Sequence, residues 1–210
     1  MAAVIDAAAC DRLTALIEEL GVGAGSRRLL EVAEVAHLAL SLRRNVRIAS
    51  LLAPDSVAVQ CTYFNKSAET NWGVALHQDT VMPVHSSTGN VQFRNRSSKE
   101  GIPHAQPPLD VLESMLAVRV HLDPNDATNG PLRVVPASHT NGVLSEAQCR
   151  LEAKKADDPQ CLVARGGALV LRPLLLHASG KLTGTTPRRV LHFVYAPRRL
   201  AGDAHWHYQV

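Results

Sequence analysis

The hydrophobic period of this chain changes near Pro54 from that of helices to that of strands. In residues 6–20 and 26–43, apolar side chains recur every three or four positions, as they do on one face of a helix. Residues 57–64 instead alternate between two faces, and they begin a series of seven or eight short strand-like segments separated by turns. This order predicts a mainly β fold with flanking helices, a double-stranded β-helix or jelly roll, and not a parallel α/β sheet.

The same patterns divide the chain into parts. The further strands are expected in residues 71–84, 115–122, 131–135, 161–164, 167–176 and 189–196. Ser145 and Gln148 make a capping-box pattern that predicts a short helix to about residue 154. We expect a single domain over 1–210, in which 1–56 form a helical N-terminal cover, 57–196 the jelly-roll core and 197–210 a C-terminal tail.

Composition narrows the possible partners. Hydrophobic residues make up 46% of the chain and charged residues 20%, as in soluble globular domains. The net charge of +3 comes from dispersed arginines, which argues against a nucleic-acid partner. The four cysteines have no C-x-x-C spacing, and the longest apolar stretch, 167–178, is interrupted by Arg172 and Pro173. With no leader pattern at the start either, we expect reduced thiols, no membrane partner and a cytoplasmic location.

A histidine and an aspartate stand two residues apart in the alternating segment 71–84. On extended backbone His77 and Asp79 project to the same face and can reach one point in space. One neutral nitrogen and one anionic oxygen suit a borderline divalent cation such as Fe(II), which would need at least one further ligand. The alternative is a hydrogen-bonded His/Asp pair at a strand end.

The further ligand has to come from the other histidines, of which the chain has ten in all. His177 is the strongest candidate, because it follows a long apolar strand at a point where a polar side chain can face the mouth of a barrel. His121 and His192 lie among apolar residues and are interpreted as core or surface histidines. His205 and His207 fall in the tail.

Two features indicate a cavity that binds an acid. Arg188 follows His177 by eleven residues and offers a planar fork that matches a carboxylate, as the anchor of an acidic cosubstrate requires. Gln60 and Thr62 share one face of the strand at 57–64, which either lines a cavity or is solvated.

Residues 87–108 are polar and show little periodicity, which predicts a long loop. We expect it to fold over a bound substrate as a lid. His85 and His104, at its two ends, are possible substrate contacts. Three other candidates for the pocket are Lys66, Trp72 and Arg119.

The order of these motifs resembles the phytanoyl-CoA dioxygenase-like branch of the Fe(II)/2-oxoglutarate oxygenases. The resemblance rests on His77-x-Asp79, on His177, and on Arg188 eleven residues later. It extends to two further stretches, 129–139 and 172–179, and spans residues 57–196. The chain departs from the common pattern at Ala137, where many relatives have glycine, and it lacks the asparagine that often follows the distal histidine.

The resemblance implies a cupin-like fold and a role for each motif. The implied iron ligands, which are also the catalytic centre, are His77, Asp79 and His177. Arg188 and Ser179 would hold the distal carboxylate of 2-oxoglutarate, and Gln60 would face the substrate or the cosubstrate. Three ligands on one face of an octahedral iron leave two positions for 2-oxoglutarate and one for O2.

The implied reaction is oxidation of a C–H bond of a small-molecule substrate, with release of succinate and CO2. Because halogenating relatives replace the carboxylate ligand with a small residue, Asp79 favours hydroxylation. Two alternatives remain at this stage: a cupin-type isomerase or lyase that uses the same ligands without 2-oxoglutarate, and a non-catalytic binding protein on a degenerate oxygenase fold. The sequence leaves the substrate and the oligomeric state open.

Overall fold

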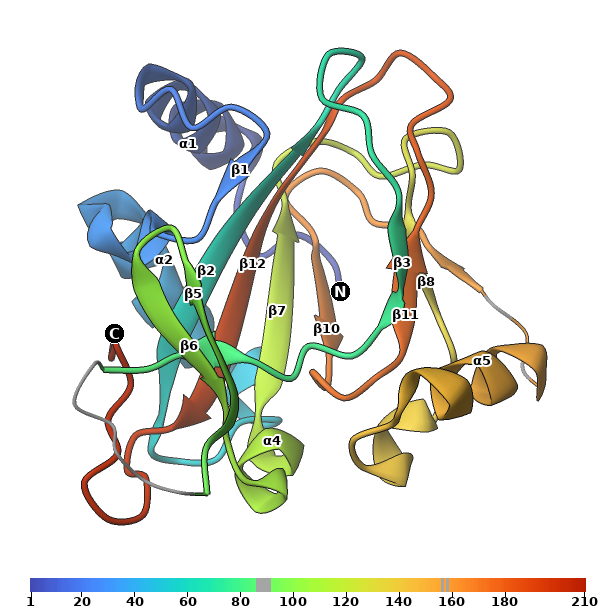
Figure 1. The fold of residues 1–210 in the computed structure, drawn as a ribbon. Coiled ribbons are helices and arrows are strands. Elements are labelled where there is room, and N and C mark those ends of the chain that lie inside the picture. Colours follow the sequence, from blue (N-terminus) through green and yellow to red (C-terminus); the bar gives the residue numbers. More distant parts are fainter. Residues whose placement is uncertain (86–91, 156, 158) are drawn as a thin grey trace.

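Two facing antiparallel sheets, with helices on the outside, form the centre of the molecule (Figure 1). The computed structural model describes residues 1–85, 92–155, 157 and 159–210. The five-stranded sheet has the order β1 (Gly25–Ser26), β2 (Ser56–Lys66), β12 (Arg188–Pro197), β7 (Leu116–His121) and β10 (Ala168–Leu171). The four-stranded sheet has the order β3 (Val74–His77), β11 (His177–Ser179), β8 (Leu132–Val134) and β9 (Gln160–Cys161). The prediction of a mainly β jelly roll is confirmed.

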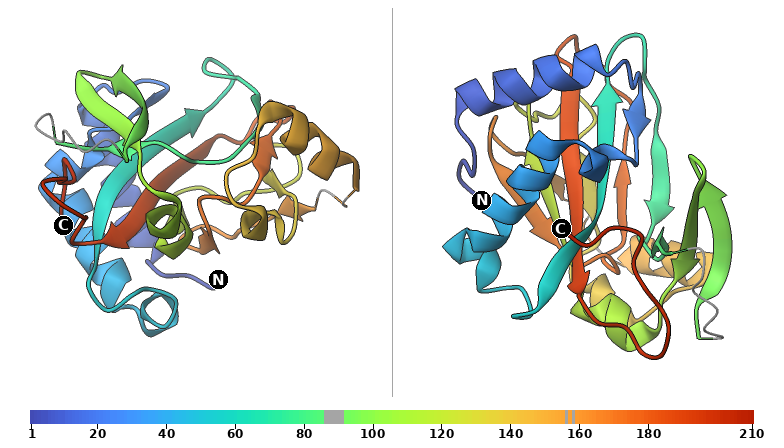
Figure 2. Two further views of the ribbon diagram at one scale, coloured as in Figure 1. Left: turned by 60° about the horizontal axis from the view of Figure 1, so that its bottom comes forward. Right: turned by 90° about the vertical axis from the view of Figure 1, so that its left-hand side faces the viewer.

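A small third sheet lies beside these two, with the order β4 (Met82–Pro83), β6 (Ile102–Gln106) and β5 (Arg94–Lys99). The helices are α1 (Ala7–Glu19), α2 (Ala33–Arg44), α3 (Val46–Ala49), α4 (Leu109–Ser114) and α5 (Glu146–Lys155). Two 3-10 turns cover Leu29–Glu31 and Ser138–Asn141. Figure 2 shows α1 and α2 on one side of the molecule and α5 on the opposite side.

The N-terminal helices bury the outer face of the five-stranded sheet. Asp6 caps α1 by accepting a 2.7 Å hydrogen bond from the backbone N–H of Ala9, and Leu13 and Ile17 turn inward one helical turn apart. Tyr195 of β12 donates its hydroxyl to the carbonyl of Ala39 in α2 at 2.8 Å. Apolar side chains of β2, β7 and β12 complete this cluster. The outer face therefore supplies hydrophobic stabilisation to strands whose other face carries polar groups.

The inner face of the same sheet changes character along its length. Near one end it is apolar, with Val59, Ala117 and Val194 in a second buried cluster. Further along, the alternation of β7 and β12 turns Arg119 and His192 inward, where they line a cavity. The strand period thus lets one sheet serve as core on one side and as the wall of a site on the other.

The predicted loop at 87–108 is largely a β-hairpin, so that prediction was wrong. β5 and β6 pair through a two-residue turn at Glu100 and Gly101, whose φ values are 53° and 79°. The sequence gives no period here because β5, Arg-Asn-Arg-Ser-Ser-Lys, is almost entirely exposed and polar on both faces. Residues 86–91 lie outside the described part of the chain.

The predicted strand 167–176 is divided. β10 ends at Leu171, because Pro173 cannot donate to a ladder, and the chain crosses to the other sheet before β11 begins at His177. His177 therefore starts a strand instead of ending one. The helix predicted for residues 26–43 is likewise interrupted, since a 3-10 turn precedes α2. The capping box of Ser145 and Gln148 is present, with the Gln148 Oε1 accepting from the Ser145 N–H at 2.8 Å.

The packing of α1 and α2 on the sheet predicts unequal costs for two leucine truncations. Leu191 is fully buried in the cluster under the helices, whereas Leu162 is 58% exposed. We expect Leu191→Ala to lower the free energy of unfolding by about 2–5 kcal/mol. Leu162→Ala should change it by less than about 0.5 kcal/mol. Urea denaturation of both variants checks this, and equal midpoints would contradict the packing described here.

Candidate metal centre

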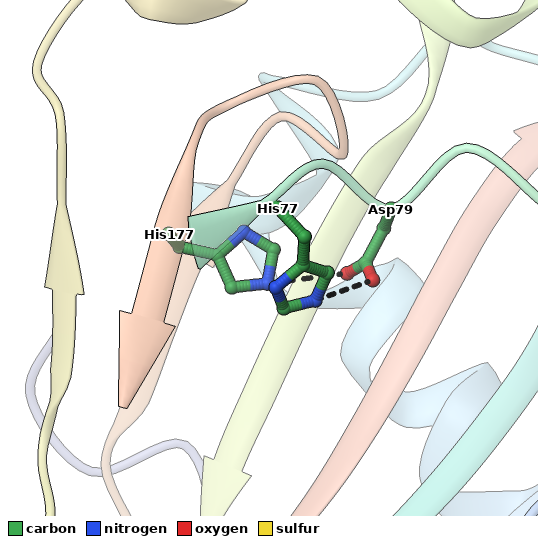
Figure 3. A group of neighbouring side chains, drawn as sticks. All are labelled: His77, Asp79 and His177. Atoms are coloured by element: carbon green, nitrogen blue, oxygen red, sulfur yellow. Dashed lines mark ion pairs between the residues drawn. The ribbon is translucent and has the colours of Figure 1, made fainter. Parts of the chain in front are cut away.

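Three side chains from two separate parts of the chain converge at the edge of the four-stranded sheet (Figure 3). His77 ends β3, and its antiparallel partner across the ladder is His177, the first residue of β11. Asp79 lies two residues beyond β3, where its backbone N–H donates to the carbonyl of Pro173 at 2.9 Å. One ligand atom from each residue lies within 4.8 Å of the other two. The three side chains are thus close enough to share one ion.

Both imidazoles present the same nitrogen to the aspartate. The Nδ1 atoms of His77 and His177 lie 2.8 Å from the carbonyls of Ala75 and Leu175. Because a carbonyl only accepts, each Nδ1 carries the proton and each Nε2 keeps its lone pair. The Nε2 atoms lie 3.6 Å and 3.7 Å from the two carboxylate oxygens of Asp79. The backbone therefore orients both rings as metal ligands require.

The protonation tendencies also suit a cation. Burial is the largest influence on Asp79 and opposes ionisation, but the surrounding imidazoles outweigh it and hold the pKa of its carboxyl far below the usual range. Burial lowers the pKa of His177, which favours the neutral ring. Burial also acts to lower the pKa of His77, yet the hydrogen bond and charge of Asp79 prevail and raise it above 6.5.

A third imidazole lies beside the carboxylate, and the sequence interpretation had taken it for a core or surface histidine. The Nε2 of His192 is 3.5 Å from Asp79 Oδ2, and its Nδ1 accepts from Arg119 Nη1 at 2.9 Å. Arg119 and His192 are direct partners across β7 and β12. The alternation of strand residues could have indicated this from the sequence, because His192 follows Arg188 by four residues on one strand and so shares its face.

A cavity of about 350 Å³ opens from this centre. The other predicted cosubstrate residues, Arg188, Ser179 and Gln60, line its wall together with Thr62. The face of Gln60 and Thr62 therefore lines a cavity and is not a solvated outer face. Among the earlier pocket candidates, Trp72 and Arg119 also line it.

Arg188 is buried with an unusual neighbour. Its Nε donates to the carbonyl of Asn129 at 3.2 Å, while its Nη1 is buried and has no partner among the described residues. Lys66 lies opposite it across β2 and β12, and the Lys66 Nζ donates to the Gly180 carbonyl at 2.5 Å and to Ser179 Oγ at 3.3 Å. Burial, chiefly, lowers the pKa of Arg188 to about 9 and that of Lys66 to about 8. Two cations that lack a counter-ion make this end of the cavity a place for an anion.

The two histidines predicted as substrate contacts do not line the cavity. His104 is buried in the small sheet, where its Nδ1 lies 2.9 Å from the carbonyl of Ile102. His85 is exposed, and its backbone N–H donates to the carbonyl of His205. The cavity mouth is instead bordered by Arg27 and Lys99, which the sequence did not single out.

The fold has many relatives of known structure. HygX from Streptomyces hygroscopicus, solved with nickel, 2-oxoglutarate and hygromycin B bound, superposes with a TM-score of 0.64 at 15% identity over 94% of this chain and 81% of that one. SnoN, an α-ketoglutarate-dependent epimerase of nogalamycin biosynthesis, gives a TM-score of 0.64 at 16% identity over 92% and 75%. EctD from S. alaskensis gives 0.59 at 20% identity over 82% and 56%. At these identities the likeness establishes the fold.

The family follows from the sequence itself. No protein of curated function matches the chain in sequence. None of the described helices is long and apolar enough to cross a membrane. The family model of phytanoyl-CoA dioxygenase (PhyH) matches residues 1–190, which is most of the chain. The protein belongs to the phytanoyl-CoA dioxygenase family and is an Fe(II)- and 2-oxoglutarate-dependent oxygenase.

Proposed function

We propose that this oxygenase hydroxylates a C–H bond of a small molecule in the cytoplasm, with Fe(II) bound by His77, Asp79 and His177. The observation that supports this most directly is the convergence of three ligand atoms within 4.8 Å, with both Nδ1 atoms engaged by carbonyls. Two imidazoles and one carboxylate are the donor set of non-haem Fe(II) oxygenases, and they leave open positions on the metal. When bound, iron and 2-oxoglutarate would supply the oxidising power, with succinate and CO2 as by-products.

The chain's own residues bind and orient the reactants. Arg188 and Ser179 line one end of the cavity, and Lys66 adjoins it through its hydrogen bond to Ser179. This basic end suits the distal carboxylate of 2-oxoglutarate. His192 supports Asp79 from the side of the sheet and is itself held by Arg119. Gln60 and Thr62 are available to contact the substrate or the cosubstrate.

Hydroxylation is the outcome most consistent with the site. A carboxylate ligand at Asp79 leaves no room for a halide on the metal. A cavity of about 350 Å³ lies in the range for small-molecule sites. A cupin-type isomerase or lyase would have no use for the Arg188 and Lys66 pair, and a degenerate binding protein would not need three preserved ligands.

Removal of one ligand should weaken iron binding far more than removal of a surface histidine. His177→Ala takes one of three donors from the site, and we expect the affinity for Fe(II) to fall on the order of a hundredfold or more. His37→Ala, on the exposed side of α2, is the matched control and should bind like the wild type. Anaerobic calorimetric titration with Fe(II) measures both. Tight binding at one equivalent by His177→Ala would refute the ligand assignment.

Iron affinity should depend on pH in two stages. The pKa of His77 is raised above 6.5, so a proton competes with iron for this ring first as the pH falls. The pKa of His177 is lowered, so its proton competes only at lower pH. We expect affinity to fall about tenfold per pH unit below His77's pKa, and more steeply lower down. Fe(II) titrations between about pH 8 and 5 test this, and a constant affinity contradicts it.

Arg188→Ala should raise the KM for 2-oxoglutarate about a hundredfold, since a buried ionic contact is lost and Lys66 alone cannot provide a planar fork. Arg189→Lys is a matched control, because Arg189 lies on the opposite face and pairs with Asp123. Succinate release against 2-oxoglutarate concentration, and the visible charge-transfer band formed without oxygen, are the measurements. Unchanged turnover in Arg188→Ala would favour the isomerase or lyase.

A further inference from the structure

Positive charge is in large excess around the cavity. Five cationic side chains line or adjoin it: Arg27, Lys66, Lys99, Arg119 and Arg188. Among the described residues, the carboxylates in contact with these groups or with the cavity are Asp79 and Glu100. Iron would add two positive charges and 2-oxoglutarate two negative ones, so an excess of three positive charges would remain after both had bound. The net positive charge that remains can therefore bind another anion.

Part of this remaining positive charge lies at the cavity mouth, away from the end of the cavity that is assigned to the cosubstrate. Arg188 and Lys66 are partners at one end of β2 and β12. Arg27 lies beside the middle of β2, since Ser26 pairs with Tyr63 and Arg28 bridges to Cys61. This is about four residues along the strand from Lys66, or roughly 13 Å at the usual rise per residue. A carboxylate held by Arg188 cannot also occupy the mouth near Arg27.

Lys99 stands at that mouth with no carboxylate in direct contact among the described residues. It ends β5, is half-buried and lines the cavity, and its ammonium group makes no hydrogen bond or ion pair with any described residue. Burial lowers the pKa of its ammonium group and the nearby Arg27 guanidinium lowers it further, while the charge of Asp79 acts in the opposite direction without offsetting them. Arg27 is partly exposed and already paired with Glu100, so the half-buried Lys99 is the cation at the mouth that still lacks a direct anionic partner among the described residues.

The hairpin tip is held in this position by Glu100. Its carboxylate accepts hydrogen bonds from Ser26 Oγ at 3.1 Å, from the Arg27 N–H at 2.9 Å and from Arg27 Nη1 at 3.1 Å. Glu100 does so with φ at 53°, a conformation that costs a residue with a Cβ about 1–2 kcal/mol. In Figure 1 the tip of the β5–β6 hairpin lies beside the N-terminal segment around β1. Lys99 and Arg27 are thus fixed side by side.

Arg119, deeper in the cavity, is the second observation that indicates an anionic ligand. Its side chain is 5% exposed, and its Nε is buried with no partner in the described part of the chain. Its contacts are the neutral ring of His192 at 2.9 Å and the face of Phe64, whose centroid is 5.3 Å from the guanidinium carbon. A buried guanidinium without a carboxylate partner is rare in proteins and marks a position for an anion.

We propose that the substrate is a small organic acid whose anionic group binds at the cavity mouth between Lys99 and Arg27, with Arg119 attracting it from below. The shared chemistry is an oxyanion, either a carboxylate or a tetrahedral phosphate ester. This assignment rests on the proposed function, because it presumes that iron and 2-oxoglutarate fill the inner part of the site. It also gives the hairpin a purpose: its tip carries a specificity residue.

The test separates the two subsites by filling the inner one first. Protein is loaded with Fe(II) and 2-oxoglutarate without oxygen, and the charge-transfer band shows whether loading has occurred. Sulfate, as a tetrahedral oxyanion, and acetate are then titrated by calorimetry at constant ionic strength with chloride. We expect saturable binding of one of them. The tighter binder identifies the phosphate-like or the carboxylate class.

Variants locate that binding. Lys99→Gln should raise the Kd of the anion at least about tenfold, and Arg27→Gln should do the same. Arg44→Gln, an exposed arginine at the end of α2, should leave it unchanged. In aerobic succinate-release assays over pairs of small acids and their amides, the acids should stimulate turnover and the amides should not.

The outcomes distinguish a failure of the proposed function from a failure of the anion subsite at the mouth. An absent band overturns the proposed function before any anion is added. A normal band with no anion binding, or with equal Kd values for Lys99→Gln and Arg44→Gln, overturns the mouth subsite alone. The mouth subsite is also overturned if the amides stimulate turnover as strongly as the corresponding acids. Melting temperatures show that the variants are folded. If Lys99→Gln and Arg27→Gln raise the Kd of the anion alike, the loss of binding is not due to a distortion of the hairpin by one substitution.

Discussion

The antiparallel pairing of β3 with β11 is the constraint on which the site depends. It sets His77 directly across from His177, although a hundred residues separate them in sequence. Neither ring can turn freely, because each Nδ1 is engaged by a carbonyl two residues earlier in its own strand. The aspartate then needs only to follow β3 by two residues to complete the group. Ladder register, a backbone property, thus fixes how the two imidazoles of the proposed metal site face each other, and side-chain packing has only to preserve this.

A sheet that buries Lys66, Arg119 and Arg188 must obtain its stability elsewhere. Desolvation lowers the pKa of each of these cations, which means that folding works against their charge. The compensation lies on the opposite face of the same strands, where α1 and α2 cover a continuous apolar cluster. The helices are therefore needed for the site even though α1 and α2 contribute no residue to its wall. Strand alternation divides stability and function between the two faces.

The sequence predicted what is encoded locally and missed what depends on pairing. His77 and Asp79 share a short motif, and the strand period placed Gln60 and Thr62 on one face, without deciding between a cavity and solvent. His192 was interpreted as a core or surface histidine because its neighbours are apolar, and only the register with Arg119 shows that it lies beside Asp79. The β5–β6 hairpin was taken for a loop since a strand exposed on both faces has no hydrophobic period. Lys99 was not predicted as a cavity residue for the same reason, because it lies on β5.

The residues at the cavity mouth lie on other elements than the two central sheets, and this separation explains how substrate preference can vary within one fold. HygX and SnoN share it with this chain at 15% and 16% identity. In this protein the proposed metal and cosubstrate residues lie on the two central sheets or directly beside them, where a change of register would move several of them at once. Lys99 and Arg27 come instead from a hairpin tip and an edge segment, joined by the hydrogen bonds of Glu100. Because those elements carry no ligand, their charges can change without disturbing iron, and substrate preference can diverge while the chemistry is retained.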